Sequence, residues 1–191
     1  MSKRVFIVHG WDGYPEEGWF PWLKTELEKR GFNVFVPSMP NPSKPEIIPW
    51  VNHLRKVIGK PDKNTFLVGH SIGCQTILHY LDTTQGDVNF GGTVFVAGFV
   101  KLENLKTDEE KDLARRWLTP LLDWEKIKSL SNKFVAIFSD NDPWVPLSNS
   151  DVFKKRLNAK IIIKNKMGHF SGSDGTKELP DVLTELIKIS K

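Results

Sequence analysis

Residues 69–73 read Gly-His-Ser-Ile-Gly and place a serine between two glycines in the pattern G-x-S-x-G. The apolar run before it, residues 65–68, is typical of a buried strand, and residues 74–81 after it have helical periodicity. A sharp strand-to-helix turn projects the Ser71 hydroxyl above a sheet and aims free helix N–H groups at the reacting group. Glycines flank the serine because side chains would not fit in so tight a turn. The pattern predicts Ser71 as the nucleophile of an acyl-transfer reaction.

A serine hydroxyl is a weak nucleophile unless a base takes its proton and a carboxylate orients that base. The chain has five histidines, and His169 is the predicted base because it lies in a loop just after the last predicted strand, where α/β folds place their chemistry. The carboxylate is expected after the penultimate strand, where both Asp140 and Asp142 lie. Asp142 is favoured because the proline after it restrains its backbone, whereas Asp140 could instead bond within the turn.

The oxyanion formed in acyl transfer needs backbone N–H donors. The N–H of Ile72 is one predicted donor because this residue directly follows the nucleophile. The second donor is expected in the loop after the first strand, residues 9–13. There the N–H of Trp11 is our prediction and that of Asp12 is the alternative.

Three aromatic side chains adjoin these positions and are predicted to line the substrate pocket. Trp11 lies in the expected oxyanion loop, Trp144 follows the favoured carboxylate, and His70 precedes the nucleophile. We expect the two tryptophans to form an aromatic wall for an apolar acyl or aryl group. The tryptophans expected in the hydrophobic core are Trp22, Trp50 and Trp117.

These loops need a sheet that brings their ends together. Short apolar runs alternate with helical patterns and are apolar on both faces, as in parallel strands covered on both sides. The predicted strands are residues 5–9, 33–36, 65–69, 93–97, 134–139 and 161–164. We therefore expect an α/β fold with three α/β/α layers, in which a mostly parallel sheet of about six strands has helices on both faces.

Residues 99–131 are the one departure from this alternation, because two helical segments stand between adjacent strands. Thr107 and Glu110 have capping-box spacing at the start of the first segment. Asp123 can cap the second. We expect this small insertion to form a lid.

Length and composition indicate one globular domain, residues 1–191, with a sizeable core. Hydrophobic residues make up 39% and charged residues 26%, which excludes a disordered chain, and no apolar run reaches the roughly 18 residues of a membrane span. The single cysteine, Cys74, is expected to be buried and fits a reducing, cytoplasmic compartment. The net charge of +4 comes from residues 151–191, which carry no nucleic-acid motif and are expected to be a solvated surface.

Together the motifs resemble the α/β-hydrolase superfamily, and within it the small serine hydrolases related to retinoblastoma-binding protein 9. The resemblance covers nearly the whole chain. It rests on His9-Gly10, Trp22-Leu23, Met39-Pro40-Asn41-Pro42 with Trp50, residues 69–73, Asp140-Asn141-Asp142-Pro143 with Val145-Pro146, and Gly168-His169-Phe170. In that family the aspartate of an Asp-Pro-x-Val-Pro stretch is the triad acid, so the resemblance implies this role for Asp142. It also implies a compact hydrolase without a large cap domain.

The predicted function is that of a serine hydrolase which cleaves small carboxylic esters or thioesters through a Ser-His-Asp triad and an acyl-enzyme. Two alternatives stay open at this point: an acyltransferase that uses the same triad, and a non-catalytic protein-binding module on the same fold. The expected partner is a small acyl ester, with no nucleic acid and no membrane, and no sequence feature supports a protein partner. No cofactor is predicted, and no metal, because ligand spacing is lacking.

Overall fold

The computed structural model describes residues 2–86 and 88–191. Over these residues the chain forms a six-stranded parallel sheet in the order β2-β1-β3-β4-β5-β6. The strands are β1 (Arg4–Val8), β2 (Asn33–Phe35), β3 (Thr65–His70), β4 (Gly92–Val96), β5 (Phe134–Ser139) and β6 (Lys160–Lys164). The first strand lies inside the sheet, because β2 pairs on one side of it and β3 on the other.

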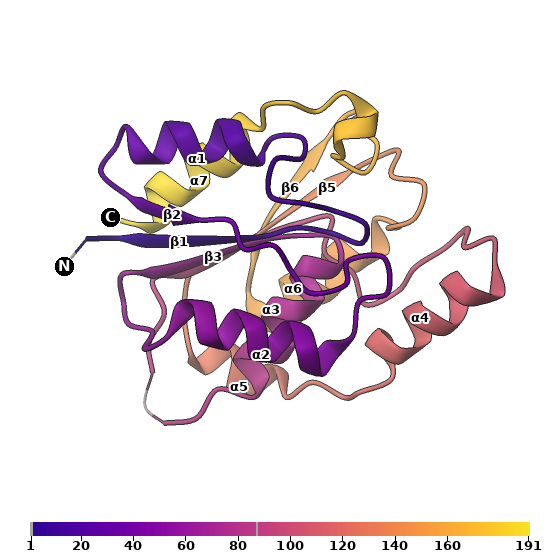
Figure 1. Ribbon diagram of the computed structural model, residues 1–191, viewed down its shortest axis with the longest axis horizontal. Coiled ribbons are helices and arrows are strands. Elements are labelled where there is room, and N and C mark those ends of the chain that lie inside the picture. The colour runs from indigo at the N-terminus through magenta and orange to yellow at the C-terminus, as the bar shows by residue number, and fades with distance from the viewer. Residues whose placement is uncertain (1, 87) are drawn as a thin grey trace.

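Helices cover both faces of this sheet. The helices of the described residues are α1 (Phe20–Glu28), α2 (Ile47–Ile58), α3 (Ile72–Asp82), α4 (Asp108–Leu118), α5 (Trp124–Ser129), α6 (Ser148–Leu157) and α7 (Pro180–Ile189), with a short 3-10 turn η1 (Gly172–Asp174). α1 and α7 lie on one face, and α2, α3, α5 and α6 lie on the other (Figure 1). The predicted three-layer α/β/α fold is confirmed. None of the described helices is long and apolar enough to cross a membrane.

The central strands lie in the hydrophobic core and have no polar face, whereas the edge strands β2 and β6 are partly exposed because no further strand covers their outer sides. Every residue of β3, β4 and β5 is buried. Trp50 and Trp117 are also buried, as predicted, and their rings meet edge to face at 6.0 Å. Because a buried indole N–H needs an acceptor, Trp50 donates to the Pro40 carbonyl at 2.7 Å and Trp117 donates to the Pro45 carbonyl at 3.0 Å. The second bond ties α4 to the loop that precedes α2.

The turn between β3 and α3 holds Ser71 in a strained backbone conformation, with φ 54° and ψ −122°. Non-glycine residues keep such values only where the surrounding structure enforces them. The two flanking glycines are required by contacts. A Cβ at Gly69 would lie 2.8 Å from the Cα of Cys74, and a Cβ at Gly73 would overlap the carbonyl oxygen of Val8. The start of α3 therefore lies directly against the end of β1.

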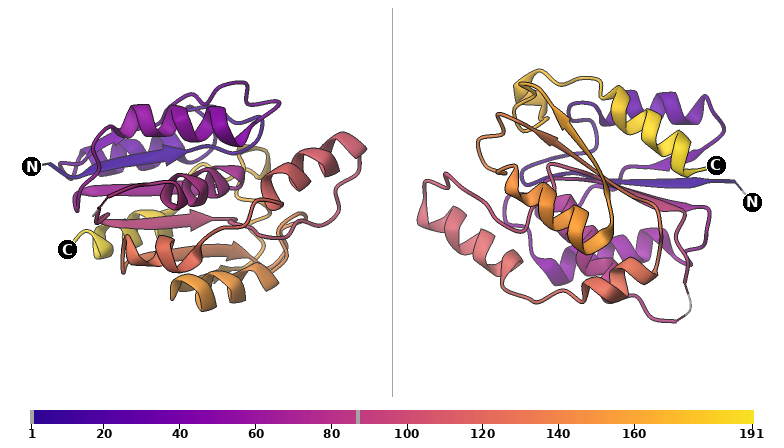
Figure 2. Two further views of the ribbon diagram at one scale, coloured as in Figure 1. Left: turned by 90° about the horizontal axis from the view of Figure 1, so that it is seen from below. Right: turned by 180° about the vertical axis from the view of Figure 1, so that it is seen from behind.

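The insertion at residues 99–131 divides into two parts. α4 begins with the predicted capping box, in which the Thr107 hydroxyl accepts the Glu110 N–H at 3.1 Å and the Glu110 carboxylate accepts the Thr107 N–H at 2.9 Å. α5 begins at its predicted cap, Asp123, and packs with α3 and α6 in the helical layer. α4 instead projects past the carboxyl ends of the strands (Figure 2). Only this first part is placed where a lid would lie.

Replacing Gly73 with alanine tests the close approach of α3 to β1. The added methyl group overlaps the Val8 carbonyl, so we expect the free energy of unfolding to fall by about 3 kcal/mol. Gly31→Ala is the control: nothing lies within 4 Å of its Cβ. Only its positive φ of 80° opposes that change, at about 1 kcal/mol. Urea unfolding followed by circular dichroism measures both variants, and equal losses would contradict the close approach.

Candidate active site

One large pocket, of about 930 Å³, opens beside α4 at the carboxyl ends of the strands. Loops after β1, β3, β5 and β6 contribute to it, which is where a parallel sheet is expected to bring its chemistry together. The predicted site residues that line this pocket are Trp11, His70, Ser71, Ile72, Trp144 and His169. The remaining predicted residue, Asp142, contacts His169 with a side chain that is only 1% exposed.

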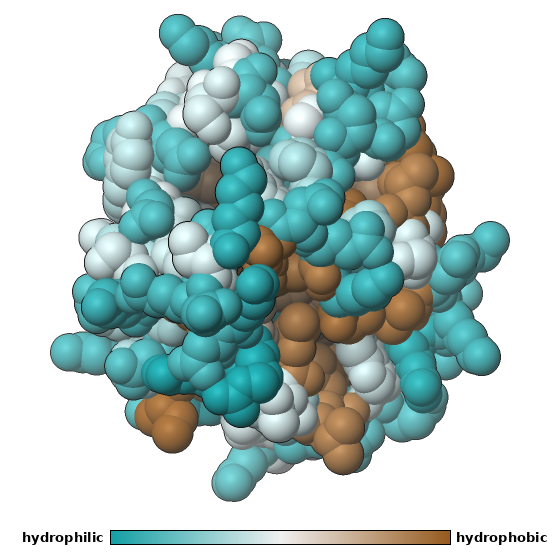
Figure 3. Space-filling model, turned by 90° about the vertical axis from the view of Figure 1, so that its right-hand side faces the viewer, coloured by the Kyte–Doolittle hydropathy of each residue, from teal (hydrophilic) through white to brown (hydrophobic). Residues whose placement is uncertain are grey.

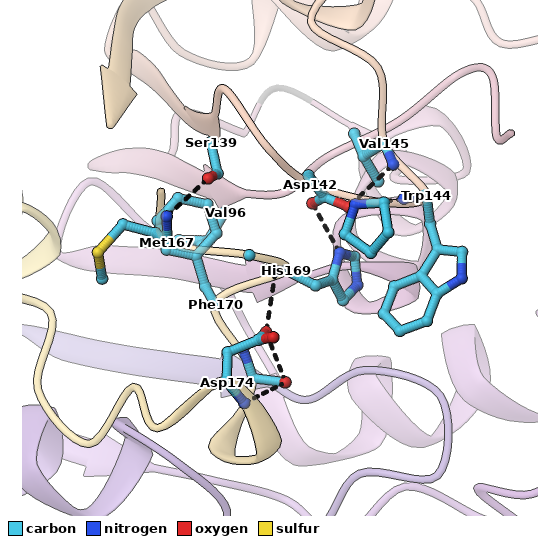
Figure 4. A network of polar contacts seen from close by, with 12 residues as sticks. Val96, Ser139, Asp142, Trp144, Val145, Met167, His169, Phe170 and Asp174 are labelled. Atoms are coloured by element: carbon cyan, nitrogen blue, oxygen red, sulfur yellow. Dashed lines mark hydrogen bonds and ion pairs between the residues drawn. The ribbon is translucent and has the colours of Figure 1, made fainter. Parts of the chain in front are cut away.

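His169 and Asp142 form a buried hydrogen-bonded pair (Figure 4). The Nδ1 atom of His169 lies 2.7 Å from Oδ2 of Asp142. The other carboxylate oxygen of Asp142 accepts the backbone N–H groups of Trp144 at 2.9 Å and Val145 at 3.0 Å. A carboxylate on Nδ1 fixes the proton there and leaves Nε2 as the ring atom that can take a proton.

Asp140, the alternative acid, bonds to the loop after β6 and not to the imidazole of His169. Its Oδ1 accepts the Lys166 N–H at 2.7 Å, and its Oδ2 accepts the side-chain amide of Asn165 at 2.7 Å. The structure therefore brings Asp142, and not Asp140, to the ring of His169. Over the described residues the Ser71 hydroxyl forms no hydrogen bond to His169, although both residues line the pocket.

The two expected oxyanion donors differ in how their N–H groups are used. Ile72 opens α3, so its N–H has no acceptor within the helix. The N–H of Asp12 donates to the Pro42 carbonyl at 2.9 Å, whereas the N–H of Trp11 has no acceptor in the described part of the chain. Of the two alternatives, only Trp11 keeps its amide for a ligand.

His9 holds the loop that carries Trp11. Its Nε2 accepts the Met39 N–H at 3.0 Å, so the ring proton is on Nδ1, which donates to the Gly10 carbonyl at 2.9 Å. Burial lowers the pKa of His9 and favours this neutral form. Gly10 lies against the nucleophile, because a Cβ at this position would be 3.3 Å from the Cβ of Ser71.

His70 supports the backbone of the candidate base. Its Nε2 donates to the carbonyl oxygen of His169 at 2.7 Å, and the two rings lie 5.0 Å apart. Burial, with the nearby His169 as a second cause, lowers the pKa of His70 to about 3. His70 is therefore neutral at physiological pH and contributes a fixed hydrogen-bond donor.

Cys74 lies outside this arrangement. Cys74 is buried below the turn, its thiol donates to the Val96 carbonyl at 3.4 Å, and burial raises the pKa of that thiol. This agrees with its predicted structural role. Over residues 2–86 and 88–191, no group of three or more His, Cys, Asp or Glu side chains could hold a metal ion.

Comparison with known proteins identifies the family. A family model described as serine hydrolase matches residues 5–188. The chain belongs to the serine hydrolase family. It is 34% identical to YdeN of Bacillus subtilis (strain 168), a hydrolase by name, over 187 residues that make up 96% of each chain. It is 25% identical to the serine hydrolase RBBP9 of Rattus norvegicus, over 91% of this chain and 89% of the relative. The predicted resemblance is confirmed, and the protein is a serine hydrolase.

Solved structures show the same architecture. The crystal structure of the Bacillus subtilis ydeN gene product superimposes with a TM-score of 0.90 at 30% identity and covers 98% of both chains. A carboxylesterase structure from Nitrososphaera gargenis has a TM-score of 0.72 at 14% identity, over 99% of this chain and 91% of that chain. The second likeness shows the fold alone.

Trp11 and Trp144, the two tryptophans predicted to form an aromatic wall, both line the pocket of this serine hydrolase. Trp144 is 41% exposed and meets the His169 ring edge to face, with centroids 5.0 Å apart and planes at 90°. Trp11 is half-buried, and its indole donates to the Ser43 carbonyl at 3.0 Å. Trp22, which we expected in the core, is half-buried and lines the pocket. Trp22 lies outside the buried stripe of α1, which consists of Phe20, Leu23 and Leu27. Its spacing from the two leucines in the sequence indicates a position outside the core.

Sequence reasoning missed the part of the pocket wall that the insertion contributes and most of the acidic residues. The apolar residues that line the pocket from the insertion are Phe99, Leu102, Leu105, Leu113 and Ala114. Apolar surface is continuous and hollowed on this side of the molecule (Figure 3). The acidic residues that line the pocket are Asp12, Glu16, Glu17 and Glu110, and burial raises the pKa of Glu17. No motif marks these positions, because they become neighbours only when α4 stands beside the loop after β1.

Trp144→Ala tests the aromatic wall. Because Trp144 is 41% exposed, its removal should cost little stability, within about 1 kcal/mol. We expect a shifted preference among p-nitrophenyl esters of increasing acyl length, since one face of the pocket is lost. Leu121→Ala, at an apolar residue that is 96% exposed outside the pocket, is the control. An unchanged acyl-length profile in Trp144→Ala would count against the wall.

Proposed function

We propose that this serine hydrolase cleaves small carboxylic esters and thioesters with a catalytic triad of Ser71, His169 and Asp142. The observation that carries the proposal is the buried 2.7 Å bond between His169 and Asp142 at the same pocket as the strained Ser71 turn. A buried carboxylate on Nδ1 is the arrangement that a serine nucleophile needs in its base.

In the acylation step the Oγ of Ser71 attacks the carbonyl carbon of the ester while Nε2 of His169 takes the hydroxyl proton. The carbonyl oxygen becomes an oxyanion, which accepts the N–H groups of Ile72 and Trp11. Asp142 stabilises the imidazolium that forms. The intermediate then breaks its bond to the leaving alcohol or thiol, and the proton on Nε2 goes to that leaving group.

Deacylation repeats these steps with water as the nucleophile. His169 takes a proton from water as the hydroxyl oxygen attacks the acyl carbon, and the oxyanion returns to the same two N–H groups. The bond to Ser71 Oγ breaks, and the proton on Nε2 returns to that oxygen. The products are a carboxylic acid and the free enzyme, with no cofactor required.

The walls of the pocket support a small apolar acyl or aryl group. A cavity of about 930 Å³ lies in the range of small-molecule sites. Trp11 and Trp144 line it from loops, Trp22 lines it from α1, and Leu102 and Leu113 line it from the insertion. Ester and thioester differ only in the leaving atom, so the same groups serve both.

A fluorophosphonate probe tests the nucleophile. We expect covalent labelling of the wild type and loss of labelling in Ser71→Ala, with ester turnover reduced by about 1,000-fold or more, because triad residues act as a unit. Ser129→Ala is the matched control: this exposed serine ends α5 and does not line the pocket, so the variant should leave labelling intact. Folded wild type that stays unlabelled would refute the triad.

The pH dependence of kcat/KM tests the base. Protonated His169 cannot take the Ser71 proton, so we expect the rate to fall at acid pH through a single dominant ionisation. Stability must be followed in parallel, because the pKa of His70 is lowered from 6.5 in the unfolded chain to about 3 in the fold. Above pH 6.5 His70 is neutral in both the folded and the unfolded chain, so the stability is fully present. As the pH falls from 6.5 toward 3, only the unfolded chain takes up the proton, and the free energy of unfolding decreases.

Circular dichroism at each pH separates the two effects. A rate that falls while the protein stays folded supports His169 as the base. A flat profile from about pH 5 to about pH 9 in folded protein would contradict that role.

A further inference from the structure

The loop that carries the candidate base has an unusual backbone. This His169 loop, residues 165–170, follows β6 and has no regular structure up to η1. Lys166, Gly168 and Phe170 all have positive φ, at 53°, 55° and 57°. Two of them are not glycines, so this conformation is unfavourable unless neighbouring groups hold it.

Side chains satisfy four consecutive backbone N–H groups of this loop. Three of the acceptors come from the segment that carries Asp142, residues 139–145. These bonds are Lys166 N–H to Asp140 Oδ1 at 2.7 Å, Met167 N–H to Ser139 Oγ at 3.0 Å, and Gly168 N–H to Asn141 Oδ1 at 2.9 Å. The fourth N–H, that of His169 itself, donates to Oδ2 of Asp174 at 2.9 Å (Figure 4).

Asp174 bonds to the His169 loop and to the residue that caps η1. Its Oδ2 also accepts the backbone N–H of Ser171 at 3.0 Å and the hydroxyl of Ser171 at 2.7 Å. A Cβ at Gly168 would lie 2.5 Å from Oδ1 of Asp174, so the carboxylate fits against the loop only because residue 168 has no side chain. On the other side of the residue, His70 donates to the carbonyl of His169.

We propose that Asp174 is a positioning residue that holds His169 in its active orientation through the backbone N–H. The inference rests on the proposed function, because it concerns the base of that triad. Asp174 does not line the pocket, so it acts through His169 and not on the substrate. Without its carboxylate, the amide between two left-handed residues loses its acceptor, and of the hydrogen bonds that His169 forms with the described residues, those to Asp142 and His70 are left.

Asp174→Ala and Asp174→Asn test this role. A base displaced by about 1 Å can lower the rate by about 100-fold. We therefore expect kcat for a p-nitrophenyl ester to fall by about 10- to 100-fold in Asp174→Ala while KM stays within about twofold. All three bonds end on one oxygen, Oδ2, so an asparagine oxygen in that place keeps them. Asp174→Asn should therefore recover most of kcat.

Asp181→Ala is the matched control. It also removes a carboxylate near the end of the chain, but this one pairs with Lys164 at 2.7 Å, away from the pocket. We expect its kcat and KM to stay within about twofold of wild type. Unchanged kcat in Asp174→Ala, a loss confined to KM, or an asparagine variant as slow as the alanine variant would each overturn the proposal.

Amide hydrogen exchange gives a readout that does not depend on turnover. We expect the N–H groups of residues 166–169 to exchange at least about tenfold faster in Asp174→Ala than in wild type, with exchange in β5 unchanged. If wild-type protein neither hydrolyses esters nor reacts with fluorophosphonate, the proposed function fails. The exchange measurement still tests whether Asp174 holds the backbone N–H of His169. Equal exchange of the His169 amide in wild type and Asp174→Ala would refute it.

Discussion

The backbone of Ser71 is the constraint on which the rest of the site depends. Its φ of 54° is maintained from three directions. The Ser71 N–H donates to the Val96 carbonyl of β4 at 2.9 Å, its carbonyl accepts the N–H of Cys74 at 2.9 Å, and Gly73 lies against the end of β1. Strands on both sides of β3 therefore enforce the turn. Because β4 is fully buried and β1 nearly so, the sheet that forms the core also fixes Ser71, the proposed nucleophile, at the first turn of α3.

The proposed base, His169, and the proposed acid, Asp142, depend on a second constraint, the register of the last two strands. Ser139 at the end of β5 is paired with Lys164 at the end of β6. The two loops that follow therefore start side by side, and the polar side chains of one can satisfy the backbone of the other. This is a local solution to a general requirement, since irregular backbone must find hydrogen-bond partners outside a ladder. Relative motion of the two loops would break several bonds at once.

The sheet and the nucleophile turn could be predicted from the sequence because their signals are local. Buried strands are continuously apolar, and a G-x-S-x-G pattern between a strand and a helix has few other interpretations. The choice between Asp140 and Asp142 was harder, because both follow the same strand, and the family resemblance strengthened it. The roles of Trp22 and Asp174 depend on contacts between distant segments. Asp174 has a carboxylate like any other surface aspartate, and nothing in its spacing indicates that it binds the amide of His169.

The neutral state of His70 has a consequence for the charge of the site. Two imidazoles lie 5.0 Å apart, and two cations at that distance in a partly dry site would repel each other strongly. Because burial holds the pKa of His70 at about 3, this ring does not compete for the proton that His169 takes up in the proposed mechanism. In the proposed mechanism the positive charge is therefore confined to the ring of His169, whose carboxylate partner, Asp142, is already in place.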